Sequence, residues 1–190
     1  MRTRASSKGS IAVKSPEANH ALPSVVLRTI REGDDEFMTV INSPEVCGEW
    51  DSFDDPAEAM LRGVDFGGGA RIVELPDGTR VGYVSWIQIP YGPNAMSLAW
   101  SLGATVVPEH RGQHIGASAQ RSLALHLLEN SRANRVQADT DIDNVPECRA
   151  LERAGFTREG IARGAQWRRG EWHDRVVYSF LRSDLGAFAN

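Results

Sequence analysis

The chain has 190 residues, an apolar content of 41% and a formal net charge of −4, so it is long enough for one domain with a sizeable core. Its two cysteines, Cys47 and Cys148, form neither a disulfide framework nor the Cys/His spacing of a zinc site, and no bound metal is expected. No apolar run approaches about 18 residues, which predicts a protein without a membrane span and favours a cytoplasmic location.

Residues 1–22 differ in composition from the rest of the chain. They carry four basic side chains against one acidic side chain, a net charge of +3, and show no hydrophobic periodicity. We therefore predict a flexible basic extension over residues 1–22, followed by one domain over residues 23–190. The alternative for the extension is a basic arm that contacts nucleic acid or phosphate.

The first part of the domain combines a strand with helical segments that are rich in acids. Residues 24–30 read as a strand, and a helix follows from the acidic cluster at 32–35 to about Ile41. Residues 43–61 then contain six acidic side chains and no Lys or Arg. One interpretation is a solvated loop and helix start, because acids favour a helix N-terminus. The other is an acidic lip that attracts a cationic acceptor, with Trp50 as its apolar or cation–π wall.

Three strands come next in the chain. Residues 70–75 and 80–89 flank a Pro-Asp-Gly turn, which is typical of a hairpin. Apolar side chains recur at every second position over residues 96–106, which predicts a third strand. The other face of this strand is small and polar, a pattern that suits packing under a helix and would also let a slim ligand lie along the backbone. Trp86 and Trp100 on these strands are candidate substrate-contacting side chains.

Residues 106–117 connect the third strand with a long helix over about residues 113–130. The first turn of a helix leaves backbone N–H groups without partners and carries the positive end of the helix dipole. Arg111 adds a fixed positive charge, while Gly112 and Gly116 let a phosphate approach the backbone closely. We therefore predict a pyrophosphate-binding loop. It lacks the Lys-Ser/Thr of a Walker loop and the glycine spacing of the dinucleotide fingerprint.

The remaining elements complete an α/β pattern. Residues 135–140 read as a short strand, and Asn144 with Glu147 has capping-box spacing at the start of a helix that ends near Gly155. Residues 157–166 and 173–181 then read as a final hairpin around 168–171.

Two separated motifs resemble the GNAT acyltransferases. The strand, Pro108 and the sequence Arg-Gly-Gln-His-Ile-Gly at 111–116 are similar to motif A of that family, except that His114 replaces its middle glycine. Asn144, residues 149–160, and His-Asp at 173–174 resemble the Rim-type branch, which comprises the N-terminal acetyltransferases of ribosomal proteins and their many small-molecule-modifying relatives. The resemblance covers about residues 25–183. It implies a single GNAT-like α/β domain whose mixed, mostly antiparallel central sheet is flanked by helices.

The resemblance also implies acetyl-CoA as the acyl donor and indicates its contacts. The pantetheine arm would pair with the backbone at Val106 and Val107, and Asn144 would help to hold it, although a plain helix cap is the other interpretation of Asn144. Family relatives are often dimers, which makes a homodimer an expectation. The pyrophosphate would lie on the N–H groups of Arg111, Gly112, Gln113, His114, Ile115, Gly116 and Ala117.

Acetyl transfer requires few catalytic groups. The ordinary amine pKa of about 10.4 means that the acceptor must lose a proton before it attacks, and the thioester oxygen needs a donor as it gains charge. Rim-type enzymes commonly have a serine where this chain has Glu147, and Leu151 stands where other branches place a tyrosine acid. We therefore predict Glu147 near the sulfur, and Asp51 or Glu49 as the proton acceptor.

Three hypotheses about function follow. The first is an N-acetyltransferase that moves an acetyl group from acetyl-CoA to a primary amine of a cationic acceptor, such as a small metabolite, an antibiotic or a protein N-terminus. The second is the same scaffold with another activated donor, for instance an aminoacyl-tRNA, which the altered motif and the basic extension suggest. The third is a non-catalytic acyl-CoA-binding domain, which the missing acid and base matches suggest.

Overall fold

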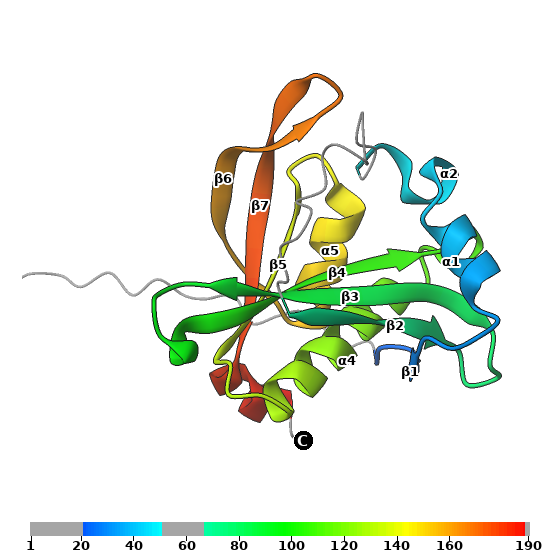
Figure 1. The fold of residues 1–190 in the computed structure, drawn as a ribbon, viewed down its shortest axis with the longest axis horizontal. Helices are drawn as coiled ribbons and strands as arrows, with labels where there is room; N and C mark the ends of the chain where they lie inside the picture. Colours follow the sequence, from blue (N-terminus) through cyan, green and yellow to red (C-terminus); the bar gives the residue numbers. More distant parts are fainter. Residues whose placement is uncertain (1–20, 51–66, 189–190) are drawn as a thin grey trace, which may run out of the picture.

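The computed structural model describes residues 21–50 and 67–188, and their strands form one seven-stranded sheet in the order β1-β2-β3-β4-β5-β7-β6 (Figure 1). Only β4 and β5 are parallel neighbours, and every other neighbouring pair is antiparallel. The predicted α/β domain with a mixed, mostly antiparallel sheet is thus confirmed. The strands are β1 (Val26–Thr29), β2 (Gly68–Glu74), β3 (Arg80–Pro90), β4 (Leu98–Val106), β5 (Arg135–Asp141), β6 (Thr157–Arg168) and β7 (Glu171–Leu181).

The main hydrophobic core lies between the sheet and two helices, α4 (Ile115–Glu129) and α5 (Val145–Ala154). Four side chains of α4 at four-residue spacing are buried, and Leu151 of α5 is buried beside them. The four are Ile115, Ala119, Leu123 and Leu127. A smaller set of buried side chains lies outside this cluster and comes from β2, β4, α1 (Asp35–Ile41) and α2 (Pro44–Cys47). Its members are Ile41, Val46, Ile72 and Ala99.

Strands β4 and β5 separate after a short paired stretch, and we call this separation the split. They pair only at Trp100–Val136 and Ser101–Gln137. Beyond these rungs β4 continues along β3 while β5 continues along β7, and Figure 1 shows the two strands diverging. The N–H of Val107 donates to Val81 O on β3. Since backbone groups alternate along a strand, those of residues 102, 104 and 106 point toward the split.

Three boundaries differ from the prediction, and each has a local cause. Residues 95–97 form a 3-10 turn rather than strand, because the Asn94 side chain accepts from the N–H of Ser97. Helix α4 begins at Ile115, two residues late, because Gly112 and His114 have left-handed φ values of 74° and 63°. The final strands extend to a two-residue turn in which Arg169 and Gly170 both have positive φ, the geometry of a type I′ hairpin.

The part of the chain that the structure describes contains no helix with the length and apolar character needed to span a bilayer. It also contains no group of three or more His, Cys, Asp or Glu side chains arranged to hold a metal ion. The predicted N-terminal extension lies almost wholly outside the described residues.

Candidate active site

The loop between β4 and α4, residues 106–117, is called the donor loop here. It passes through a 3-10 turn (Pro108–His110) before α4, and its first helical hydrogen bond runs from the N–H of Ser118 to His114 O. The N–H groups of residues 115–117 therefore have no acceptor among the described residues. A Cβ added to Gly112 would meet no atom within 4 Å. The donor loop is an open set of backbone donors, as an anion site requires.

The Arg111 side chain is already used to join two elements. Its Nε donates to Val106 O at 2.9 Å, and its Nη2 donates to Val46 O of α2. These bonds fix α2 against the end of β4. Gln113 Nε2 similarly donates to Glu109 O at 3.3 Å. Arg111 thus supplies positive charge next to the predicted phosphate position, while two of its donors serve the fold.

The structure distinguishes the two residues predicted to pair with pantetheine. The backbone N–H of Val106 points toward the split, and this favours its predicted role. The N–H of Val107 donates to Val81 O at 3.0 Å, so it is not available to a ligand. Gly116 lies next to the same strand end, since a Cβ placed on it would be 3.7 Å from Val106 Cγ2. The split and the donor loop are therefore contiguous.

Glu147 and Asn144 lie at the start of α5. The Asn144 side chain accepts from the N–H of Glu147 at 3.3 Å, so Asn144 does cap the helix. Glu147 Oε1 accepts from Nε2 of the fully buried Gln120 at 2.9 Å, and this bond joins α5 to α4. A Cβ on Gly116 would also lie 3.9 Å from Gln120 Nε2. These contacts bring Glu147 close to the strand end at Val106, and its place near a bound thioester stays a prediction.

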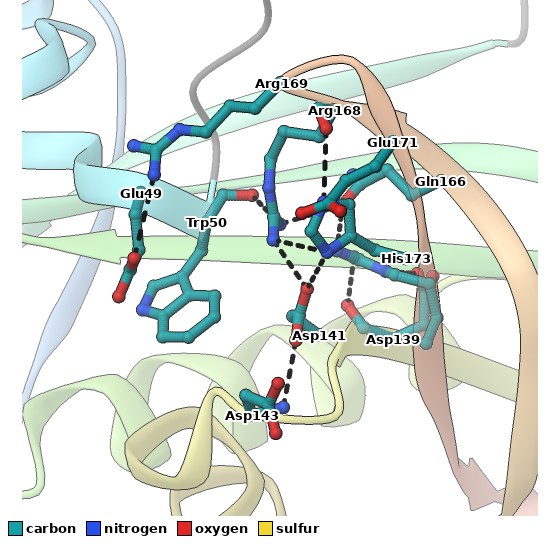
Figure 2. Close-up of polar contacts among 11 residues, drawn as sticks. Glu49, Trp50, Asp139, Asp141, Asp143, Gln166, Arg168, Arg169, Glu171 and His173 are labelled. Carbon is teal, nitrogen blue, oxygen red and sulfur yellow. Dashed lines mark hydrogen bonds and ion pairs between the residues drawn. The ribbon is translucent and has the colours of Figure 1, made fainter.

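A second group of polar side chains comes together around Arg168, and we call Trp50, Asp141, Gln166, Arg168 and His173 the Arg168 cluster (Figure 2). The guanidinium Nη2 donates to Asp141 Oδ2 at 2.7 Å, and Nη1 donates to Trp50 O at 3.1 Å and to Gln166 Oε1 at 3.2 Å. The side chains of Arg168 and Asp141 are only 4% and 2% exposed. The cluster ties together the segment at Trp50, the end of β5 and the β6–β7 hairpin.

Hydrogen bonding determines the charge state of Asp141 and the tautomer of His173. Burial by itself raises the pKa of the Asp141 carboxyl, but the Asp143 N–H and the Arg168 guanidinium lower it more, so its pKa lies below the usual value. His173 Nδ1 is 3.1 Å from Arg168 Nη2, and its Nε2 is 3.1 Å from Arg168 O. Because a guanidinium can only donate, we assign the ring proton to Nε2.

The predicted acceptor-side residues have different surroundings. The ring of Trp50 faces a cation of its own chain, since Arg168 Cζ is 5.6 Å from the ring centroid. The Glu49 carboxylate is 57% exposed and lies 3.7 Å from Arg169 Nη1. Asp51 lies outside the described residues. Trp86 and Trp100 pack against the main core on the α4 side, and Trp100 Nε1 donates to Ser131 Oγ. Their placement indicates a packing role and does not support contact with substrate.

Sequence reasoning missed the partnership of Arg168 and Asp141. The two residues are 27 positions apart in different elements, and neither is part of a recognisable motif. The one available signal was the type I′ turn at 169–170, which fixes where the hairpin ends and therefore where Arg168 is placed.

Comparison with known proteins identifies the family. Residues 24–157 match the family model described as Acetyltransferase (GNAT) domain. The probable N-acetyltransferase YjcK of Bacillus subtilis (strain 168) is 32% identical over 113 residues, which covers 60% of this chain and 61% of YjcK. Phosphinothricin N-acetyltransferase of Streptomyces viridochromogenes is 35% identical over 78 residues, covering 40% of this chain and 42% of that enzyme. The chain thus spans less than two thirds of the length of either relative.

Solved structures share the fold. Mycobacterium smegmatis RimJ in complex with CoA-disulfide superposes with a TM-score of 0.68 at 19% identity, covering 86% of this chain and 84% of RimJ. Spermidine N-acetyltransferase from Vibrio cholerae in complex with CoA and spermine superposes with a TM-score of 0.65 at 19% identity, covering 84% of this chain and 96% of that enzyme. Since the family model spans well over half of the sequence, the chain belongs to the GNAT acetyltransferase family.

Proposed function

We propose that the protein is an N-acetyltransferase that transfers an acetyl group from acetyl-CoA to a primary amine. The observation that carries this proposal is the split, whose free β4 edge leads directly to the open N–H groups of the donor loop. Residues 102–106 of β4 offer about 13 Å of strand edge, enough for an extended pantetheine arm. The family likeness supports the same ligand.

The residues of the donor loop fit an acyl-CoA. The N–H groups at the start of α4 would hold the pyrophosphate, and the open space at Gly112 admits it. The Val106 N–H would pair with the pantetheine arm. Bound acetyl-CoA would supply an activated thioester carbonyl, and the protein would orient this carbonyl toward the amine.

The reaction balances with one proton released. A protonated amine loses one proton and its nitrogen bonds to the thioester carbon. The carbon–sulfur bond then breaks, and the departing thiolate takes up the second nitrogen-bound proton to give an amide and free CoA. Glu147, held by Gln120, is the group that we place near the sulfur. Glu49 is exposed to solvent, where a carboxylate can pass the first proton to water, and Asp51 remains the alternative acceptor.

Thermal shift and thioester consumption test this proposal. At about 100 times its dissociation constant, acetyl-CoA should stabilise the protein by roughly 2.7 kcal/mol. Thioester loss should then depend on an added primary amine. A Gly116→Leu variant adds a side chain next to Val106 and Gln120, at the junction of the split and the donor loop, and should lose the shift. Glu129→Leu at the exposed far end of α4 is the matched control and should keep it.

Three results would contradict the proposal. Absence of any thermal shift with acetyl-CoA would exclude acetyl-CoA as the acyl donor. Binding of tRNA with a steep salt dependence, without acetyl-CoA binding, would favour an aminoacyl-tRNA donor. A shift with acetyl-CoA but no thioester loss with a broad amine panel would favour a non-catalytic binding domain. The homodimer stays a prediction that sedimentation tests.

A further inference from the structure

A cavity of about 300 Å³ lies on the sheet face opposite α4 and α5, and it is called the sheet cavity here. Its polar lining comes from β5, β6 and β7, and the rest of its wall is small and apolar. Gln137 is the last β5 residue that pairs with β4, so the sheet cavity begins where the split begins. The polar lining residues are Gln137, Asp139, Gln166 and Arg175.

The hydrogen bonds fix which way both glutamine amides point. Gln166 Oε1 accepts from Arg175 Nη1 at 2.9 Å and from Arg168 Nη1 at 3.2 Å. Gln137 Oε1 accepts from Arg135 Nη2 at 3.0 Å and from the Tyr91 hydroxyl. Because guanidinium groups only donate, each amide must direct its oxygen toward them and its NH₂ group elsewhere. Neither NH₂ group has an acceptor among the described residues, so both remain as donors for a ligand.

Asp139 adds one acceptor to these two donors. Its Oδ2 accepts from Arg175 Nε at 2.7 Å, whereas its Oδ1 has no partner within the described part of the chain. Its side chain is 33% exposed. Arg175 also donates from Nη2 to Asp139 O and from Nη1 to Gln166, so its nitrogens are held by the protein. One carboxylate and one guanidinium leave the lining with no net formal charge.

From this lining we infer that the acceptor is a small zwitterionic primary amine, a molecule that carries a carboxylate or a similar anion close to its amine. The inference rests on the proposed function and assigns the substrate class of that site. The ammonium group pairs with Asp139 Oδ1, and the anion accepts from the amide NH₂ groups of Gln137 and Gln166. A polyamine has only donors, so it would leave both amides unmatched and would place a second cation beside Arg175.

A matched pair of acceptors tests the substrate class. L-Methionine and L-methioninamide share the amine and the side chain, but only the first has a carboxylate. With acetyl-CoA saturating, kcat/KM for methionine should exceed that for its amide and for spermidine by at least about tenfold, because hydrogen bonds to a carboxylate are stronger than those to a neutral carbonyl and spermidine has no acceptor. If the thioester is consumed faster with spermidine or with a peptide N-terminus, the inference is overturned while the acetyltransferase proposal stands.

The Gln166→Glu variant distinguishes a role of Gln166 in substrate recognition from a purely structural role. Glutamate keeps an oxygen for Arg168 and Arg175, so the fold should be retained, but it replaces the donor NH₂ with a negative oxygen. KM for methionine should rise at least about tenfold while kcat changes little, and spermidine should become the better substrate. A purely structural role would lower activity with both acceptors equally. Calorimetric titration of methionine into the CoA complex gives a readout independent of turnover, and no binding there would also overturn the inference.

Discussion

The donor loop and the Arg168 cluster place their polar groups by opposite means. The donor loop offers backbone N–H groups from consecutive residues, and the side chains of Arg111, Gln113 and His114 within it are exposed. The Arg168 cluster uses buried charged side chains, and Arg168 reaches a carbonyl 118 positions away. A backbone site tolerates changes of side chain, as His114 in a glycine position illustrates. A buried ionic cluster does not, because removal of one member leaves another charge without a partner.

Removal of the Arg168 charge should have the largest effect on stability. Arg168→Met should lower the free energy of unfolding by about 3–5 kcal/mol, because it leaves the Asp141 carboxylate buried and unpaired. Urea unfolding measures this loss. Arg169→Met is the matched control, since its pair with Glu49 is exposed and should contribute less than about 1 kcal/mol. The double variant Arg168→Met/Asp141→Leu should recover much of the lost free energy of unfolding. If Arg168→Met alone lowers that free energy by less than about 1 kcal/mol, the Arg168 cluster is no more sensitive to substitution than the donor loop.

A change at Glu147 tests the side-chain chemistry near the donor. Glu147→Gln can still accept from Gln120 Nε2, so the unfolding midpoint should hardly change. If Glu147 handles a proton near the sulfur, kcat should fall about 10²- to 10⁴-fold. Glu152→Gln, which changes the acceptor of the Tyr178 hydroxyl elsewhere on α5, should keep its kcat. Equal activity of the Glu147 variant and wild type would reduce Glu147 to a helix contact.

The pH dependence of stability probes Asp141 without removing Arg168. The pKa of Asp141 is lower in the folded protein than its ordinary value of about 3.9, so its ionised form stabilises the fold above roughly pH 4. That contribution disappears as the pH falls through the folded-state pKa. The difference in unfolding free energy between wild type and Asp141→Asn should therefore shrink below about pH 4. A difference that grows with acidification would contradict the sign, and Asp143→Asn, which retains its N–H, serves as control.

The smallest effect concerns the donor loop. His114 has φ 63°, a conformation that costs a side chain with a Cβ about 1–2 kcal/mol. His114→Gly should raise the free energy of unfolding by less than about 1 kcal/mol, because glycine loses more entropy on folding. His114→Ala should bring no such gain. If His114→Gly destabilises the protein, the His114 imidazole makes a stabilising contact in the wild type. Weaker acetyl-CoA binding by His114→Gly would instead assign the His114 imidazole to the phosphate.

Most elements could be predicted from local patterns. The period-two strand before the donor loop, the long helix after it and the Asn144 cap all follow from neighbouring residues, and the structure confirms them. Boundaries were less predictable where a side chain competes with the backbone. Asn94 draws residues 95–97 out of the strand, and the left-handed residues 112 and 114 delay the helix. Such effects depend on single hydrogen bonds and dihedral angles rather than on periodicity.

The sequence by itself determined the family and the donor loop, because a strand, a turn and a helix N-terminus are formed by consecutive residues and leave their N–H groups open whatever lies around them. Only the tertiary structure decided the surroundings of the residues proposed for the acceptor side. It showed that Trp50 already faces Arg168 and that Trp86 and Trp100 belong to the packing. It also showed that Gln137, Asp139 and Gln166 share one cavity. These residues become neighbours only through strand order and register, which join positions that no local pattern relates.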